Sequence, residues 1–96
     1  MKHLKNVHPG EILQNDFLEP LNITAYMLAK RIMVDQTRIS QLIKGKRRLS
    51  ADTALRLAVF FDMSAEFWLN AQARYDLVEE REKKAVYSEI KPFEAV

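Results

Sequence analysis

Residues 23–48 constrain the fold of this chain more than any other part of the sequence. Their apolar residues recur at intervals of three and four, as in two short helices, and a tight turn that begins at Val34 separates the two. Polar side chains open the second helix, Gly45 ends it, and a basic triplet at residues 46–48 follows. A helix in the DNA major groove needs hydrogen-bonding side chains on its first turn, where base edges are reached, and cations beyond it for phosphates. The pattern therefore predicts a helix-turn-helix that binds DNA.

The chain is short, and its charge is concentrated in two regions. With 96 residues it has room for one domain with a modest core, and a chain of this size folds alone only marginally. The net charge is only +2, but residues 30–48 hold seven basic residues against one acid, and residues 76–82 hold four acids against one base. The two regions should present opposite potentials, and a polyanion should prefer the first.

Several classes of protein are excluded by what the sequence lacks. There is no cysteine, which excludes disulfides and thiolate chemistry and gives no reason to expect an oxidising compartment. The longest wholly apolar run, residues 57–61, is far shorter than the roughly 20 residues of a membrane span, and the first residues contain no apolar signal core. These observations predict a cytoplasmic protein that contacts no membrane.

Apolar periodicity predicts an all-α fold of five helices with a short C-terminal tail. The predicted helices cover about residues 10–18, 24–33, 36–44, 51–61 and 65–83. Residues 1–83 form the predicted DNA-binding domain. The tail at residues 84–96 contains Pro92 and is expected to be either a short edge strand or a flexible end.

Particular residues mark the ends of these helices. Thr24, Asp35 and Ser50 are placed as N-caps of the second, third and fourth helices. Pro20 should end the first helix, because a continuing helix does not tolerate proline. Gly45 should end the third helix in a left-handed conformation.

The outward face of the third helix carries the candidates for base readout. Glutamine pairs with adenine and arginine with guanine through two hydrogen bonds each, which nominates Gln36, Arg38 and Gln41. Thr37 suits a thymine methyl group or a phosphate, and Lys44 lies on the same outward side.

The candidates for phosphate contact flank that helix. Lys46, Arg47 and Arg48 lie just past its end, and Thr24, with the first amides of the preceding helix, points at the flanking strand. The alternative is an ordinary solvated helix face beside a solvated basic loop. The combination of cap, polar first turn, glycine stop and basic triplet favours DNA binding over that alternative.

The other polar residues do not indicate catalysis or metal binding. His3 and His8 have no carboxylate or cysteine at a ligand spacing, so we expect them to be free surface histidines. The sequence shows neither a Ser, His and Asp set nor a glycine-rich phosphate cradle. We therefore expect no enzyme, cofactor, metal or small-molecule substrate.

Aromatic residues gather around the junction of the fourth and fifth helices, at Phe60, Phe61, Phe67 and Trp68. Core filling accounts for Phe61 and Trp68, but a chain this small cannot easily bury all four. A two-fold dimer would double the DNA site over half-sites about one helical turn, roughly 34 Å, apart. We therefore expect a homodimer formed through the fifth helix.

Three segments resemble one known family. HPGEIL at residues 8–13, RISQLIKGKRRLSADTALRLAVFF at 38–61 and EFWLNAQARYDL at 66–77 are similar to the HigA-type antitoxins, or virulence-associated protein I family. These belong to the lambda-repressor-like (Xre) helix-turn-helix class. The resemblance implies a type II antitoxin that binds a HigB-like mRNA endonuclease toxin and, as a dimer, represses its own operon. It also implies recognition-helix positions at Gln36, Thr37, Arg38, Ser40, Gln41 and Lys44.

One residue departs from the family pattern. Many members of the class have glycine where this chain has Met33, at a point where the backbone is commonly left-handed. A bulky residue there should be strained by roughly 1 kcal/mol or should force a different turn. Two alternative functions remain, a stand-alone repressor without a toxin and a toxin-binding module that has lost DNA function.

Overall fold

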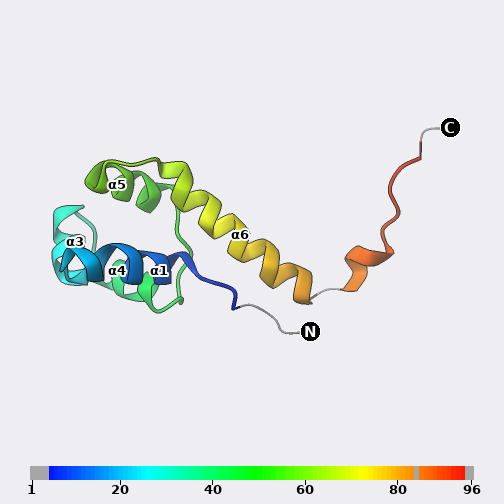
Figure 1. Ribbon diagram of the computed structural model, residues 1–96, viewed down its shortest axis with the longest axis horizontal. Coiled ribbons are helices and arrows are strands. Elements are labelled where there is room, and N and C mark those ends of the chain that lie inside the picture. The colour runs from blue at the N-terminus through cyan, green and yellow to red at the C-terminus, as the bar shows by residue number, and fades with distance from the viewer. Residues whose placement is uncertain (1–4, 84, 95–96) are drawn as a thin grey trace.

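The computed structural model describes residues 5–83 and 85–94, and every regular element in those residues is helical (Figure 1). The first predicted helix is built from three consecutive pieces. The elements in chain order are α1 (Pro9–Ile12), the π-helix η1 (Leu13–Leu18), α2 (Glu19–Leu21), α3 (Ala25–Arg31), α4 (Gln36–Ile43), α5 (Ala51–Phe61), α6 (Ala65–Lys83) and the 3₁₀-helix η2 (Ala85–Glu89).

The prediction that Pro20 ends the first helix is wrong. Residues 13–18 are wound as a π-helix, and the N–H of Glu19 donates to the carbonyl of Gln14, five residues back. Pro20 therefore enters at the start of a new helical turn, in α2, where its missing N–H is tolerated. The chain leaves this turn at Asn22, which is left-handed at φ 57°.

Three of the four predicted cap residues behave as expected. The Thr24 hydroxyl accepts from the N–H of Met27, and the Ser50 hydroxyl accepts from the N–H of Thr53. Gly45 follows α4 with a left-handed φ of 74°. Asp35 occupies the cap position of α4, but its side chain makes no capping hydrogen bond there, which corrects that prediction.

Met33 confirms the expected strain in the turn between α3 and α4. Its φ is 62°, in the left-handed region that disfavours a residue with a Cβ. The Met33 side chain is 79% exposed, so packing offers little compensation. The preceding helix ends two residues earlier than predicted, at Arg31, with Ile32 as its C-cap.

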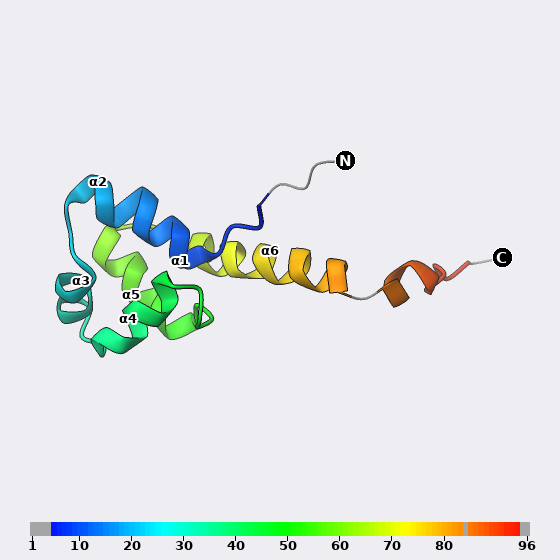
Figure 2. The same ribbon diagram turned by 90° about the horizontal axis from the view of Figure 1, so that it is seen from below.

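One apolar core holds the helices together. Its most deeply buried members come from all of the main helices: Leu13, Leu18, Leu28, Ile39, Leu42, Leu57 and Trp68. Figure 2 shows α6 leaving this body beside α1 and continuing well beyond it. We use the term body for residues 5–76 and the term C-terminal arm for residues 77–83 and 85–94.

Two further predictions are corrected by the structure. His8 is buried, not a free surface residue: its Nδ1 accepts from the N–H of Gly10 and its ring meets the edge of Tyr75. The tail holds no edge strand among its described residues, because residues 85–89 close a 3₁₀ turn that brings the Ser88 hydroxyl onto the Ala85 carbonyl. His3 and residues 84, 95 and 96 lie outside the described residues.

Candidate nucleic-acid interface

The outward face of α4 is open to solvent, as predicted. Gln36 and Thr37 on its first turn and Lys44 at its end are exposed. Ser40 and Gln41 are half-buried between them. The polar ridge of α4 is thus an accessible surface.

The inward face of α4 fixes how that ridge is presented. Ile39 and Leu42 are fully buried in the core. On the far side of α4, Gly10 of α1 lies so close that a Cβ there would be 1.8 Å from the carbonyl oxygen of Leu42. This approach requires glycine, and it locks α4 between α1 and α3.

The Arg38 side chain is partly exposed, but its guanidinium already forms hydrogen bonds with other residues of the chain. Its Nη1 donates to the Oδ2 of Asp52 at 2.6 Å and to the Oγ1 of Thr53 at 3.3 Å. Both partners lie in the first turn of α5. A guanidinium that reads a base from this position must first leave Asp52.

Three other predicted DNA contacts have partners on the protein. The Arg47 Nε donates to the Oε1 of Gln41 at 3.1 Å, which joins a predicted phosphate contact to a predicted base contact. The Arg48 Nη1 donates to the Oδ2 of Asp76 on α6 at 2.6 Å. A residue of the acidic region thus pairs with the basic loop. The two regions therefore do not form the separate surfaces of opposite potential that the sequence predicts.

Thr24, Lys44 and Lys46 are predicted contacts that lie on the open surface without an ion pair among the described residues. Thr24 is exposed, and its hydroxyl caps α3. Lys44 and Lys46 are exposed, and among the described residues their ammonium groups form no ion pair. Among the predicted contact residues, these two lysines are therefore the cations most available to a polyanion.

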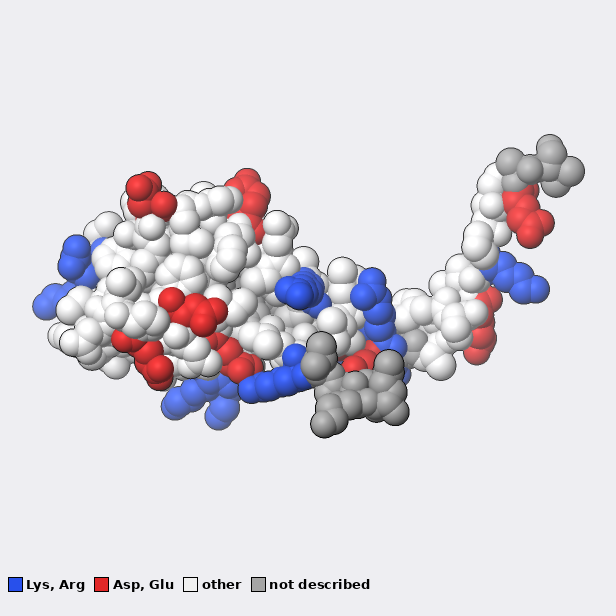
Figure 3. All heavy atoms as spheres, in the orientation of Figure 1, with Lys and Arg blue, Asp and Glu red and all other residues white. Residues whose placement is uncertain are grey.

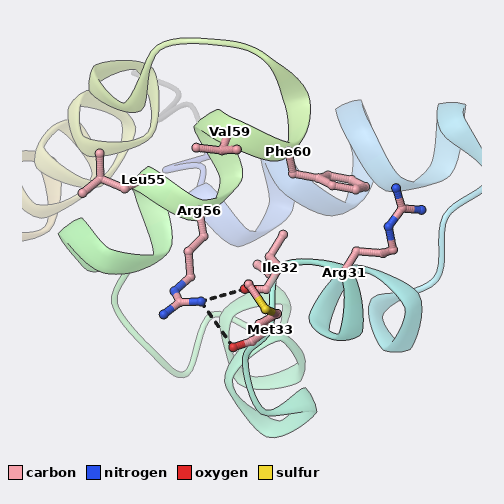
Figure 4. A pocket seen from close by; sticks show the side chains of 7 residues that line it. All are labelled: Arg31, Ile32, Met33, Leu55, Arg56, Val59 and Phe60. Carbon is pink, nitrogen blue, oxygen red and sulfur yellow. Dashed lines mark hydrogen bonds between the residues drawn. The ribbon is translucent and has the colours of Figure 1, made fainter.

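Arg56 supports the turn that precedes α4, and the sequence pattern did not predict this role. It reaches from α5 to the turn before α4, where its Nη1 donates to the carbonyls of Ile32 at 2.8 Å and Met33 at 3.3 Å (Figure 4). Its Nε donates to the Oδ2 of Asp52 at 3.0 Å. The spacing of four residues between Asp52 and Arg56 was the available signal, because such pairs meet on one helix face.

The Asp52 carboxylate accepts hydrogen bonds from two guanidinium groups. The hydrogen bond from Arg38, followed by the one from Arg56, lowers the pKa of Asp52 below its ordinary value. The carboxylate therefore stays ionised near neutral pH. Acidic and basic side chains also lie side by side on the wider surface. Figure 3 shows acidic side chains beside the Lys and Arg side chains that project from the lower edge of the body.

The described residues contain no cluster of His, Cys, Asp and Glu that could hold a metal ion. Among them, no helix is both long enough and apolar enough to cross a membrane.

Comparison with known proteins places this geometry in a family. The Helix-turn-helix family matches residues 16–68. Virulence-associated protein I of Dichelobacter nodosus is 42% identical over 81 residues, which cover 83% of this chain and 75% of that protein.

Two solved structures from Pseudomonas aeruginosa are similar over nearly the whole chain. PA4674 in complex with its 18-bp operator DNA has a TM-score of 0.89 and 34% identity, covering 95% of this chain and 100% of that one. Antitoxin HigA with the higBA promoter has a TM-score of 0.85 and 36% identity, covering 93% and 99%. The all-α, lambda-repressor-like fold is thereby confirmed. The chain belongs to the Helix-turn-helix family, in the group that includes the HigA antitoxins and virulence-associated protein I.

Proposed function

We propose that this chain is a type II antitoxin that binds operator DNA as a dimer, represses its own operon and neutralises a HigB-like mRNA endonuclease. The observation that carries the proposal is the exposed polar ridge of α4, which the core holds in place from behind. The ridge has the composition of a major-groove helix. Two similar structures, those of PA4674 and of antitoxin HigA, contain operator or promoter DNA.

The proposed contacts divide into those that read sequence and those that position the protein. Base readout is assigned to Gln36, Thr37, Arg38, Ser40, Gln41 and Lys44. Phosphate contact is assigned to Thr24, Lys46, Arg47 and Arg48. Exposure of Gln36 and Thr37 on the first turn supports the first group, since the first turn of a recognition helix reaches deepest.

The proposed dimer forms through α6. Phe67, Leu69 and Leu77 expose apolar surface along this helix, and Phe67 stays 43% exposed although its ring edge meets Trp68. Apolar side chains that recur on one helix and remain uncovered suit a second copy of the chain. A two-fold pair of α4 helices would then read two half-sites.

DNA recognition is tested with the full chain and duplexes enriched from a random-sequence library. Arg38→Ala should weaken binding to the enriched duplex by roughly 1–3 kcal/mol and should change binding to random duplexes little. Lys46→Ala should weaken binding to all duplexes and reduce the slope of log affinity against log salt by about one. Equal losses on enriched and random DNA in the Arg38 variant would exclude base readout by this residue.

The toxin partner rests on the family and is tested by expression. A neighbouring gene should encode a small basic protein that stops growth when expressed alone and is harmless when expressed with this chain. Growth arrest that this chain does not relieve would exclude the antitoxin role and leave a DNA-binding repressor.

A further inference from the structure

We propose that Asp52 lowers the affinity of the DNA-binding surface by holding the Arg38 guanidinium against α5, where it competes with DNA for this side chain. The inference rests on the proposed DNA-binding function. It adds a residue from α5 that itself reads no base. It also makes the ion pair between α4 and α5 part of recognition, not a structural link alone.

The geometry gives Arg38 two alternative positions. In the structure its Nη1 is 2.6 Å from the Oδ2 of Asp52, and the side chain is still 30% exposed. The backbone of Arg38 belongs to the first turn of α4, next to the exposed Gln36 and Thr37. A rotation of side-chain torsions is therefore enough to move the guanidinium from α5 towards a base edge.

Arg56 lowers the free-energy cost of releasing Arg38 from Asp52. The Oδ2 of Asp52 accepts from both arginines, at 2.6 Å from Arg38 and 3.0 Å from Arg56. When Arg38 leaves, Asp52 keeps Arg56, which stays fixed by the carbonyls of Ile32 and Met33 (Figure 4). The carboxylate is not left unpaired, and the turn before α4 keeps its support.

The strength of the ion pair relative to that of each DNA contact determines when Arg38 leaves Asp52. An exposed ion pair favours the bound geometry by about fivefold or less. Exchanging it for one exposed contact with a phosphate is therefore close to neutral, and Arg38 has no reason to leave Asp52 on random DNA. A two-bond contact with guanine is worth about 5- to 150-fold against the wrong base. Only the second exchange clearly favours release.

Removing the Asp52 charge should therefore raise DNA affinity. With Asp52→Asn, Arg38 is free to contact phosphates on any duplex. Affinity for random duplexes should rise several-fold, and the slope of log affinity against log salt should steepen by about one. Affinity for the enriched duplex should rise at least as much, by up to about fivefold, because the contact with guanine no longer displaces the ion pair.

The matched control is Asp35→Asn. Asp35 is an exposed carboxylate immediately before α4, and its side chain makes no capping hydrogen bond, so this variant removes the same charge near the same surface without freeing an arginine. Binding of the full-length variants is measured by fluorescence anisotropy over a range of salt concentrations. Thermal unfolding confirms that each variant is folded.

A double-mutant comparison isolates Arg38. In an Arg38→Ala background, Asp52→Asn should produce no more gain on random duplexes than Asp35→Asn does. A gain from Asp52→Asn that equals the gain from Asp35→Asn, or that persists without Arg38, overturns the inference, because simple loss of negative charge then explains it. A wild-type chain that enriches no sequence overturns the DNA-binding function itself, and the inference with it.

Discussion

The two halves of α6 differ in what surrounds them. Towards its N-terminus the helix buries Trp68 completely and Gln72 almost completely. The Gln72 amide accepts from the N–H of Leu49 at 2.7 Å and donates to Asp76 at 2.9 Å. From Leu77 onward, no described residue of the C-terminal arm is buried.

The arm nevertheless carries apolar side chains. Val86, Tyr87, Ile90 and Phe93 are all exposed, and Phe93 is 92% exposed. The arm projects far from the body (Figure 1). One end of α6 thus stabilises the domain and orients the basic loop before α5, whereas the arm leaves most of its apolar side chains uncovered.

Substitutions in the core and in the arm should differ strongly in their effect on the free energy of unfolding. Trp68→Ala should lower the free energy of unfolding by about 3–5 kcal/mol, because it empties a fully buried site. Phe93→Ala should change it by no more than about 0.5 kcal/mol. Urea unfolding followed by far-UV circular dichroism, at one fixed protein concentration, measures both. Similar losses for the two variants would show that the arm is part of the folding unit.

A second test addresses the close approach of α1 and α4. Gly10→Ala should cost about 1–3 kcal/mol or more, because its Cβ would lie 1.8 Å from the Leu42 carbonyl oxygen and the helices would have to separate. Since α4 would move, DNA affinity should fall as well. Urea unfolding and anisotropy give the two readings.

Gly45→Ala is the matched control for that test. Its nearest contact would be a comfortable 3.8 Å from His8 Cγ, so the expected loss of about 1 kcal/mol comes from the left-handed backbone alone. A larger loss at Gly45 than at Gly10 would contradict the packing argument.

Most helix limits were predictable, because each is signalled within a few residues of chain. The predicted helices at 51–61 and 65–83 have the observed limits of α5 and α6. Ser50 caps the start of α5, and Asp62 ends it in a left-handed conformation. The first helix was predicted less well, because the rule that proline ends a helix assumes α-helical pairing and not the π-helical turn that precedes Pro20.

The pairing within the candidate site was not predictable from spacing. Helical periodicity correctly placed Gln36 and Thr37 on the solvent side of α4. It could not show that Arg38 meets Asp52, 14 residues away, because that contact depends on how α5 lies against α4. The burial of His8 likewise depends on Tyr75, which is distant in the sequence and is brought against His8 by the packing of α6.

The left-handed backbone at Met33 should lower the stability of the body. Met33→Gly should raise the free energy of unfolding by about 1 kcal/mol, because glycine relieves the left-handed strain and the exposed Met33 side chain loses little packing. Thermal and urea unfolding measure the gain. Asp62→Gly is the control: Asp62 is also left-handed, at φ 55°, but aspartate visits that region more readily, so its gain should be smaller. A loss of stability in the Met33 variant would show that its side chain supports the turn.

The stability of the body should also depend weakly on pH, through His8. Burial lowers the pKa of His8 from its ordinary value of 6.5, and the nearby Glu11 and Asp76 partly offset that shift. The unfolded chain therefore binds a proton at His8 more readily than the folded chain does. Stability from this group is fully present above pH 6.5 and is lost as the pH falls below 6.5 through the lowered value.

The structural reason is that the His8 Nδ1 must stay unprotonated to accept from the Gly10 N–H, at 2.9 Å. The melting temperature should fall as the pH is lowered below 6.5, before most carboxylates titrate. His8→Asn keeps a capping acceptor without a titratable ring, so it should flatten that part of the curve. Phe93→Ala should keep the wild-type slope, because the arm lies far from this cap. A slope that survives in the Asn variant would mean that another group of the body titrates there.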